Sequence, residues 1–255
     1  INLGDSDDFH LSGEFTIECW FYRKNGGSTQ SIISQWTGSN STRSFLFQVH
    51  ATNNLSFVAS DGSSTHTINT PDVEVPVGRW VHLAVQHRSS DQAFILYLDG
   101  RRIHANTMSI TPQNSSANVE IGRNGDGPSE YVNGFVSNLR IVNGSYVYPV
   151  PTATRGYAFT PSTTPLTNVT NTKLLCCQSA TDAEEAAVSP NALSRQGTTF
   201  ATSNEVTGSL VVALPLYDGA LSSGFGDYSP YIRGPQGGPA KTITAGGNIS
   251  MGATD

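Results

Sequence analysis

Apolar and polar residues alternate along one stretch near the middle of the chain, residues 134–141. An extended backbone places Phe135, Ser137, Leu139 and Ile141 on one side, and Val136, Asn138 and Arg140 on the other. Alternation with a period of two is typical of a half-buried strand. Turn dipeptides flank it, Asn133-Gly134 before and Asn143-Gly144 after. The pattern therefore predicts a strand whose apolar side needs a second sheet to cover it.

The same kind of alternation predicts further strands along the first 178 residues. Residues 14–23 carry aromatic side chains on both faces, which predicts a central strand. Asp99-Gly100, between expected strands at 94–98 and 101–104, is a strong hairpin signal. Other strands are expected at 30–36, 44–50, 55–59, 65–69, 79–87 and 118–122. Because no amphipathic helix is found there, we predict an all-β antiparallel β-sandwich of the jelly-roll type.

The composition narrows the class of protein. Only 13% of the 255 residues are charged, and the formal net charge is -6. No cluster of Lys and Arg is present, so we expect no nucleic-acid partner. No apolar run reaches the roughly 18 residues of a membrane-spanning helix, so we expect no membrane insertion. Cys19, Cys176 and Cys177 fit neither a disulfide framework nor a zinc site, which predicts buried thiols.

Five segments resemble one known family in content and order. They read FTIECWFY, GRWVHLAVQH, FILYLDGRRI, VEIGR and YVNGFVSNLRIVNGSYVY. Together they resemble laminin-G-like, concanavalin A-like lectin/glucanase domains, and more narrowly the versions found in structural and tail proteins of marine bacteriophages. The resemblance spans residues 1–179 and implies a concanavalin A-like sandwich. Because this fold hosts lectins, hydrolases and spacers, the resemblance is far less specific for the ligand.

The C-terminal third differs in character. Residues 180–208 are linker-like, and the Ala and Glu content of 179–189 predicts a short helix that Pro190 ends. Residues 209–255 predict an extended β-rich appendage, which resembles the opening of a phage module. Three alternatives stay open for it: the start of a following module, strands that fold back beside residues 1–8, or strands exchanged with a neighbouring copy. We expect a homo-oligomer, and Ile1 in place of an initiator Met predicts a fragment or processed product.

Familiar catalytic motifs are missing from the sequence. A glucanase of this fold uses paired carboxylates in a Glu-x-Asp-x-x-Glu arrangement, about 5 Å apart, and that spacing does not occur. Glu18 is alone on its strand, and the six histidines are scattered singly. Neither a Gly-x-Ser-x-Gly elbow nor a phosphate-binding loop is present. We therefore predict that the protein is not an enzyme, with a polysaccharide hydrolase as a weaker alternative.

Two groups of oxygen-bearing residues are candidates for calcium, which prefers carboxylate and amide ligands. One group is Asn124, Asp126, Glu130 and Asn133, and the other is Asp5, Asp7 and Asp8. The family resemblance also implies calcium at the rim of the sandwich, whereas the alternative interpretation is that these residues only form turns.

Glycan sites on β-sandwiches usually combine an aromatic platform with amide and carboxylate hydrogen bonds. The candidates at expected loop edges are Trp36, Tyr131, Tyr146 and Tyr148. Trp20 and Trp80 lie in the middle of strands and are expected in the core.

The resemblance implies a non-enzymatic phage virion protein, a tail-fibre or capsid-decoration module that adheres to host surface glycans. The expected partners are host surface polysaccharide and other virion proteins, and the expected location is the surface of the phage particle. The alternative is a purely structural spacer whose C-terminal strands bind a neighbour.

Overall fold

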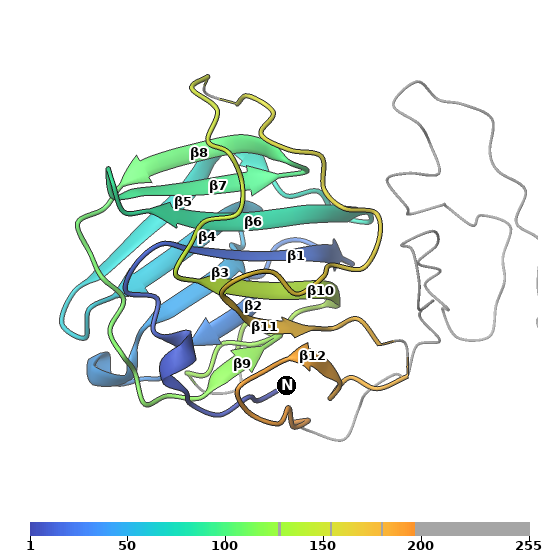
Figure 1. Cartoon of the computed structure of the whole chain (residues 1–255). Helices are drawn as coiled ribbons and strands as arrows, with labels where there is room; N and C mark the ends of the chain where they lie inside the picture. The colour runs from blue at the N-terminus through green and yellow to red at the C-terminus, as the bar shows by residue number, and fades with distance from the viewer. Residues whose placement is uncertain (127–128, 154, 180, 197–255) are drawn as a thin grey trace, which may run out of the picture.

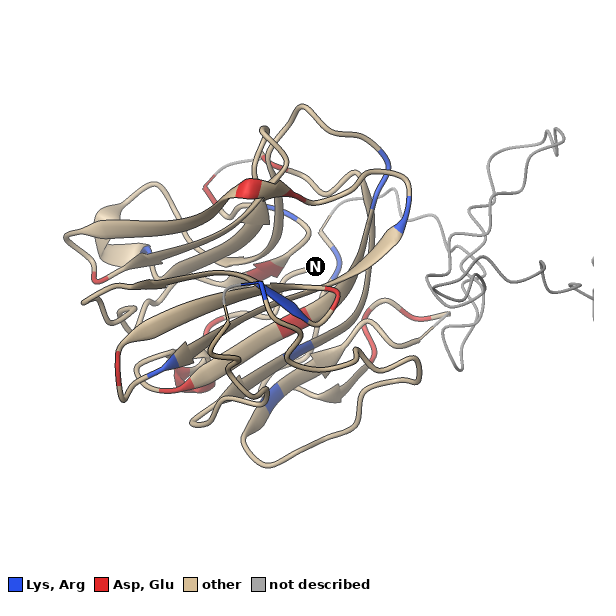
Figure 2. Ribbon diagram, turned by 90° about the horizontal axis from the view of Figure 1, so that it is seen from above, with Lys and Arg blue, Asp and Glu red and all other residues tan. Residues whose placement is uncertain are grey.

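The computed structural model describes residues 1–126, 129–153, 155–179 and 181–196. These residues form two stacked antiparallel sheets with almost no helix (Figures 1 and 2). The seven-stranded sheet has the order β12-β11-β10-β1-β6-β7-β8, and the five-stranded sheet has the order β5-β4-β3-β2-β9. The predicted all-β antiparallel sandwich is confirmed. The expected appendage at 209–255 lies outside the described residues.

The elements are η1 (Asp7–Phe9), β1 (Phe15–Arg23), β2 (Gln30–Gln35), η2 (Asn40–Thr42), β3 (Phe45–Val49), β4 (Asn54–Ser60), β5 (Thr65–Glu74), β6 (Trp80–Arg88), β7 (Ala93–Leu98), β8 (Arg101–Thr107), β9 (Val119–Ile121), β10 (Gly134–Asn143), β11 (Thr172–Cys176) and β12 (Ala186–Val188). Among the described residues, the two helical elements are short 3-10 turns, and no helix is long and apolar enough to cross a membrane.

Strand β1 is central, as its two aromatic faces predict. It pairs with β10 on one side and β6 on the other. Its alternate residues point between the sheets, where the Phe15 ring lies 5.5 Å from the ring of Phe57 in β4. Trp20 and Trp80 are both buried, but on the opposite face of the sheet, where they cluster with Phe135.

The strict alternation predicted for β10 is wrong in its first half. The pairing of β1 with β10 shifts register between Glu18 and Trp20, which is a β-bulge, and Asn138 has a positive φ of 52°. The extra residue is in β10, and it moves the side chains that precede it to the opposite face of the sheet. Leu139 therefore packs in the core between the sheets as predicted, whereas Phe135 lies on the outer face.

Part of the segment expected to be a linker belongs to the sandwich. The short helix predicted within 179–189 is wrong, because Ala186–Val188 is extended and pairs with β11. Further on, Ser194 and Asn2 exchange two backbone hydrogen bonds of 2.8 Å. The sheet therefore continues past residue 179. The added strand β12 pairs with the edge of β11, which would otherwise be left unpaired. All three cysteines are free thiols: Cys19 and Cys176 are buried, and Cys177 is half-buried.

Candidate functional site

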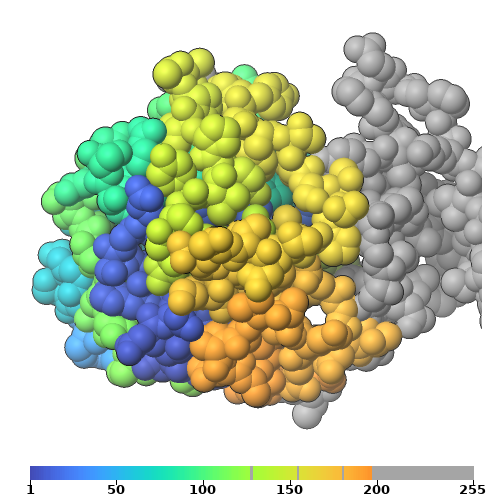
Figure 3. All heavy atoms as spheres, viewed as in Figure 1, coloured from blue at the N-terminus to red at the C-terminus, as the bar shows by residue number. Residues whose placement is uncertain are grey.

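The outer face of the seven-stranded sheet is covered by one irregular segment, residues 145–153 and 155–167, which we call the strap. Figure 1 shows the strap in yellow running across this sheet, and Figure 3 shows its atoms over much of the same face. The rings of Tyr148 and Phe159 stack within it, 3.4 Å apart. Trp20 Nε1 donates a hydrogen bond of 3.1 Å to the carbonyl of Ser162. The fold itself therefore occupies this face.

A buried carboxylate lies beneath the strap. Glu18 is fully buried and accepts a hydrogen bond of 2.9 Å from Arg140 Nε. Its other oxygen lies 3.0 Å from His82 Nε2 and accepts a hydrogen bond from the Tyr148 hydroxyl. Arg140 Nη1 also donates to the carbonyl of Thr167. This network joins β1, β6, β10 and the strap, so its role is structural.

The environment of Glu18 makes the protein sensitive to acid. Burial alone raises the pKa of Glu18, but the hydrogen bond from His82 and the charges of His82 and Arg140 outweigh burial, so the pKa lies below its usual 4.5. Such a carboxylate stabilises the fold above the unfolded-state pKa, and that stabilisation is lost as the pH falls through the folded-state pKa. We expect the free energy of unfolding, measured in urea, to decrease as the pH is lowered below about 4.5. The drop should be smaller in Glu18→Gln, which has no carboxylate to protonate; an equal drop in both proteins would contradict this role.

The outer face of the five-stranded sheet is different. Its apolar side chains, Trp36, Leu46 and Val58, form a small cluster of their own. Among the described residues, no apolar side chain from another segment packs against this cluster. The strap, in contrast, contributes several apolar side chains to the clusters on the seven-stranded sheet. Among the described residues, the outer face of the five-stranded sheet is therefore the one that lacks an apolar cover from another segment, although its three apolar side chains are only 6–7% exposed.

A row of polar residues runs beside the apolar cluster. Ser31, Gln48, Ser56 and Asn69 are register partners on β2, β3, β4 and β5, so their side chains share this face. Ser31 Oγ lies 3.3 Å from Gln48 Oε1 and 2.8 Å from Glu130 Oε2. Within the described part of the chain, Ser56 Oγ has no hydrogen-bond partner and Gln48 Nε2 has no acceptor. The row thus offers both donors and acceptors.

The loop after β9 closes one end of this face. Asn124 Nδ2 donates a hydrogen bond of 3.1 Å to Glu130 Oε2, which holds the two ends of the loop together. The Arg43 guanidinium lies over the Trp36 ring, 5.3 Å from its centroid, and 3.9 Å from the Asp126 carboxylate. Arg43 therefore connects the loop to the aromatic residue beside the polar row.

The first group predicted to bind calcium does not converge on one point. Asp5 accepts a hydrogen bond from Gln35, Asp7 accepts one from Asn114, and Asp8 pairs with Lys173 at 2.6 Å. Each carboxylate thus faces a different partner within the protein.

The second group predicted to bind calcium is brought together in part. Asn124, Asp126 and Glu130 share one loop, whereas the backbone nitrogen of Asn133 is bonded to Gln30. No cluster of three or more His, Cys, Asp or Glu suited to a metal is found in the part of the chain that the structure describes, which omits 127–128. The described oxygens are largely used by protein donors and do not by themselves form a calcium cage. Calcium binding stays a prediction.

The four aromatic residues predicted to contact glycan fall on two surfaces. Trp36 lies on the five-stranded sheet but is only 7% exposed, because Arg43 covers its ring. Tyr131 follows Glu130 directly and is 53% exposed. Tyr146 and Tyr148 belong to the strap, where the ring and hydroxyl of Tyr148 are both engaged. The structure therefore brings Trp36 and Tyr131 to the side of the polar row, and separates the other two from it.

The polar row itself cannot be identified from the sequence alone. Ser31, Gln48 and Ser56 are ordinary polar residues between core residues, and no motif marks them. The signal that identifies them is strand pairing: once β2, β3 and β4 are aligned, their outward positions form one line. Arg43 was missed for the same reason, since its position over Trp36 depends on how η2 folds back.

Comparisons with known proteins agree with this architecture. Residues 1–146 match a family model described as the concanavalin A-like lectin/glucanases superfamily. No curated protein matches the chain. Similar solved structures include a putative carbohydrate binding protein from Bacteroides ovatus ATCC 8483, at 14% identity over 58% of this chain and 42% of that chain, with a TM-score of 0.46. The chain thus spans less than half the length of that protein.

Two further solved structures are similar at the same level. The SAP-like pentraxin from Limulus polyphemus is 18% identical over 57% of this chain and 76% of that chain, with a TM-score of 0.42. The CBM40 of the Ruminococcus gnavus IT-sialidase is 13% identical over 57% of this chain and 89% of that chain, with a TM-score of 0.46.

Proposed function

Because the chain belongs to the concanavalin A-like lectin/glucanase superfamily, we propose that it is a non-catalytic carbohydrate-binding module. One observation carries the proposal: the strap covers the outer face of the seven-stranded sheet, whereas the outer face of the five-stranded sheet carries the polar row and no such cover among the described residues. The proposed binding surface is therefore the polar row with the neighbouring apolar cluster.

The chemistry of this surface suits a sugar ring. A pyranose has hydroxyl groups around its edge and apolar C–H groups on its faces, so it needs hydrogen bonds and apolar contact side by side. Gln48, which is 7% exposed, supplies a free amide donor at the surface. Ser56 Oγ makes no hydrogen bond within the described chain but is buried beside Gln48, so Gln48 is the first polar contact for a ligand. Leu46 and Val58, on the adjacent outward positions of β3 and β4, supply the apolar contact.

The carboxylates near this surface support binding over catalysis. Glu130 accepts hydrogen bonds from Ser31 and Asn124, and Glu120 forms an ion pair with Arg123. A retaining or inverting glycosidase needs one carboxyl group kept protonated and a second one free to act. We expect no release of reducing sugar when the protein is incubated with the polysaccharides that it binds; sustained release would contradict the non-catalytic proposal.

For the biological setting, we propose a phage virion surface, where the module adheres to host surface polysaccharide. The five sequence segments and their order support this setting, as does the polar, weakly charged composition. Binding to other virion proteins, assembly into a homo-oligomer and a contribution from calcium belong to the same proposal. Antibody against the protein should label intact phage particles, and antibody that labels only lysed host cells would contradict the location.

A glycan array tests the binding function, and Gln48→Ala locates it. We expect the protein to bind a defined set of neutral oligosaccharides, and Gln48→Ala to weaken that binding about two- to tenfold, because a neutral hydrogen bond contributes about 0.5–1.5 kcal/mol. Asn106→Ala, which removes an exposed amide from β8 of the other sheet, is the matched control and should bind like the native protein. No binding on the array, or equal losses in both variants, would contradict the proposal.

A further inference from the structure

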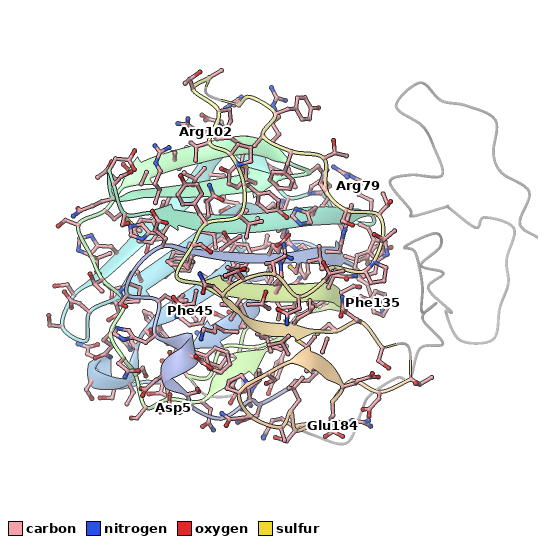
Figure 4. The ribbon with its side chains drawn as sticks, in the orientation of Figure 1. Asp5, Phe45, Arg79, Arg102, Phe135 and Glu184 are labelled. Carbon is pink, nitrogen blue, oxygen red and sulfur yellow. The ribbon has the colours of Figure 1, made fainter. Side chains whose placement is uncertain are left out.

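A pocket lies on the opposite side of the molecule from the loop after β9, where the strap meets the edges of both sheets. It has a volume of about 230 Å³ and is lined by residues of β5, the β7–β8 hairpin and the strap: Val73, Leu98, Asp99, Arg101, Ile103, Arg155 and Tyr157. Figure 4 labels Arg102, the neighbour of Arg101, at this edge of the sandwich. Nothing in the proposed sheet-face site uses this pocket.

Arg101 is held in place but keeps free donors. Its Nε donates to the carbonyl of Arg155, and its backbone forms a bridge with Tyr157. The guanidinium carbon lies 5.7 Å from the centroid of the Tyr157 ring. In the described part of the chain, the Nη groups of Arg101 have no acceptor. A fixed guanidinium with two free Nη groups is suited to a bidentate contact with a carboxylate.

The acidic residue in the pocket does not cancel this charge. Asp99 accepts a hydrogen bond of 2.9 Å from the backbone nitrogen of His82 and pairs with Arg79 at 3.1 Å. Among the residues that the structure describes, the second guanidinium, that of Arg155, pairs only with Asp72, at 3.4 Å and with both side chains well exposed. Exposed pairs of this kind are weak and easily exchanged. The pocket is therefore a cationic one.

The remaining walls are apolar or aromatic. Val73, Leu98 and Ile103 supply aliphatic surface, and Tyr157 is 78% exposed, the largest exposed fraction among the large apolar side chains described. An exposed aromatic ring beside an aliphatic wall offers a surface for the C–H face of a sugar. The volume is below the roughly 300–1,000 Å³ of pockets for drug-sized ligands, which favours a single ring.

We propose that this pocket is a second saccharide site, which binds an acidic sugar residue with its ring against Tyr157 and its carboxylate on Arg101. The proposal rests on the proposed function for the class of ligand, and it goes beyond that function in assigning a separate site with a requirement for negative charge. Two sites on different sides of the sandwich also allow one molecule to contact two units of a polysaccharide surface.

Calorimetric titration of the full chain tests the second site. The probes are trigalacturonate, trimannuronate and the methyl ester of each, which keeps the rings and removes the charge. We expect at least one acid to bind about tenfold or more tightly than its ester, because a hydrogen bond to a charged group contributes more than a neutral one. Arg101→Gln should remove this preference, and Tyr157→Ala should weaken both forms.

The matched control is Arg88→Gln, which makes the same change in charge at the far end of β6, where Arg88 pairs with Asp91. It should bind the acid like the native protein. Absence of binding by both acids, equal affinity for acid and ester, or equal losses in Arg88→Gln and Arg101→Gln would each overturn the proposal. Failure of this site is distinguishable from failure of the proposed function, because Gln48→Ala should weaken only neutral glycans and Arg101→Gln only acidic ones.

Discussion

Replacing Glu18 by Gln is expected to lower the free energy of unfolding by about 3–5 kcal/mol, which is a large part of the stability of a typical domain. The carboxylate is fully buried, and Arg140 beneath the strap is only 5% exposed. In Glu18→Gln the Arg140 guanidinium stays buried without a counter-charge, and a neutral amide oxygen and the Thr167 carbonyl are left to accept its hydrogen bonds. The Tyr148 hydroxyl of the strap also loses its charged acceptor on β1, the Glu18 carboxylate. Urea unfolding at neutral pH measures the loss.

The matched control for Glu18→Gln is Asp91→Asn. Asp91 also pairs with an arginine, Arg88, but its side chain is 47% exposed. Exposed pairs contribute about 0.2–1 kcal/mol at most. If Glu18→Gln lowered the unfolding free energy no more than Asp91→Asn does, the buried network would not be what holds the strap on the sheet.

Replacing Phe57 by Ala is expected to cost about 3–5 kcal/mol, the usual range for removing a buried Phe from a core. Phe57 is fully buried at the centre of the sandwich, where its ring lies 5.5 Å from Phe15, 5.7 Å from Phe94 and 6.4 Å from Phe45. These contacts join β4 to strands of both sheets. Removing the ring leaves a cavity between the sheets that these neighbours fill only in part.

Thermal and urea unfolding of Phe57→Ala should therefore show a lower midpoint with a single transition. Val77→Ala is the control, because Val77 is 44% exposed and its truncation should change the unfolding free energy by about 0.5 kcal/mol or less. A loss below about 1 kcal/mol in Phe57→Ala would contradict the packing of the two sheets described above.

Local patterns in the sequence predict where the strands lie, but not always on which face of the sheet each side chain lies. The alternation of β1 and the Asp99-Gly100 turn depend on a few neighbouring residues, so both are visible from sequence alone. The bulge opposite Cys19 is not, because it depends on how β10 pairs with β1, and it moves Phe135 to the outer face. The strand at Ala186–Val188 was missed similarly, since its extended form depends on the free edge of β11.

The candidate site is even less visible in the sequence, because its parts come from separate strands. Glu18 was expected to be alone on its strand, yet Arg140 is its register partner on β10. His82 of β6, which pairs with Trp20, reaches Glu18 diagonally. The polar row likewise depends on the register of four strands. In contrast, the loop containing Asn124 and Glu130 was predicted as a unit, because its residues are close in the chain.

Carbohydrate binding by the five-stranded sheet is tested most directly by chemical-shift mapping of backbone amides with the neutral oligosaccharide that binds best on the array. We expect the largest shifts around Ser31, Gln48, Ser56 and Glu130 on the outer face of the five-stranded sheet, and little change in the strap residues around Tyr148. Shifts gathered on the strap, or no shifts with any oligosaccharide, would contradict a carbohydrate-binding surface on the five-stranded sheet.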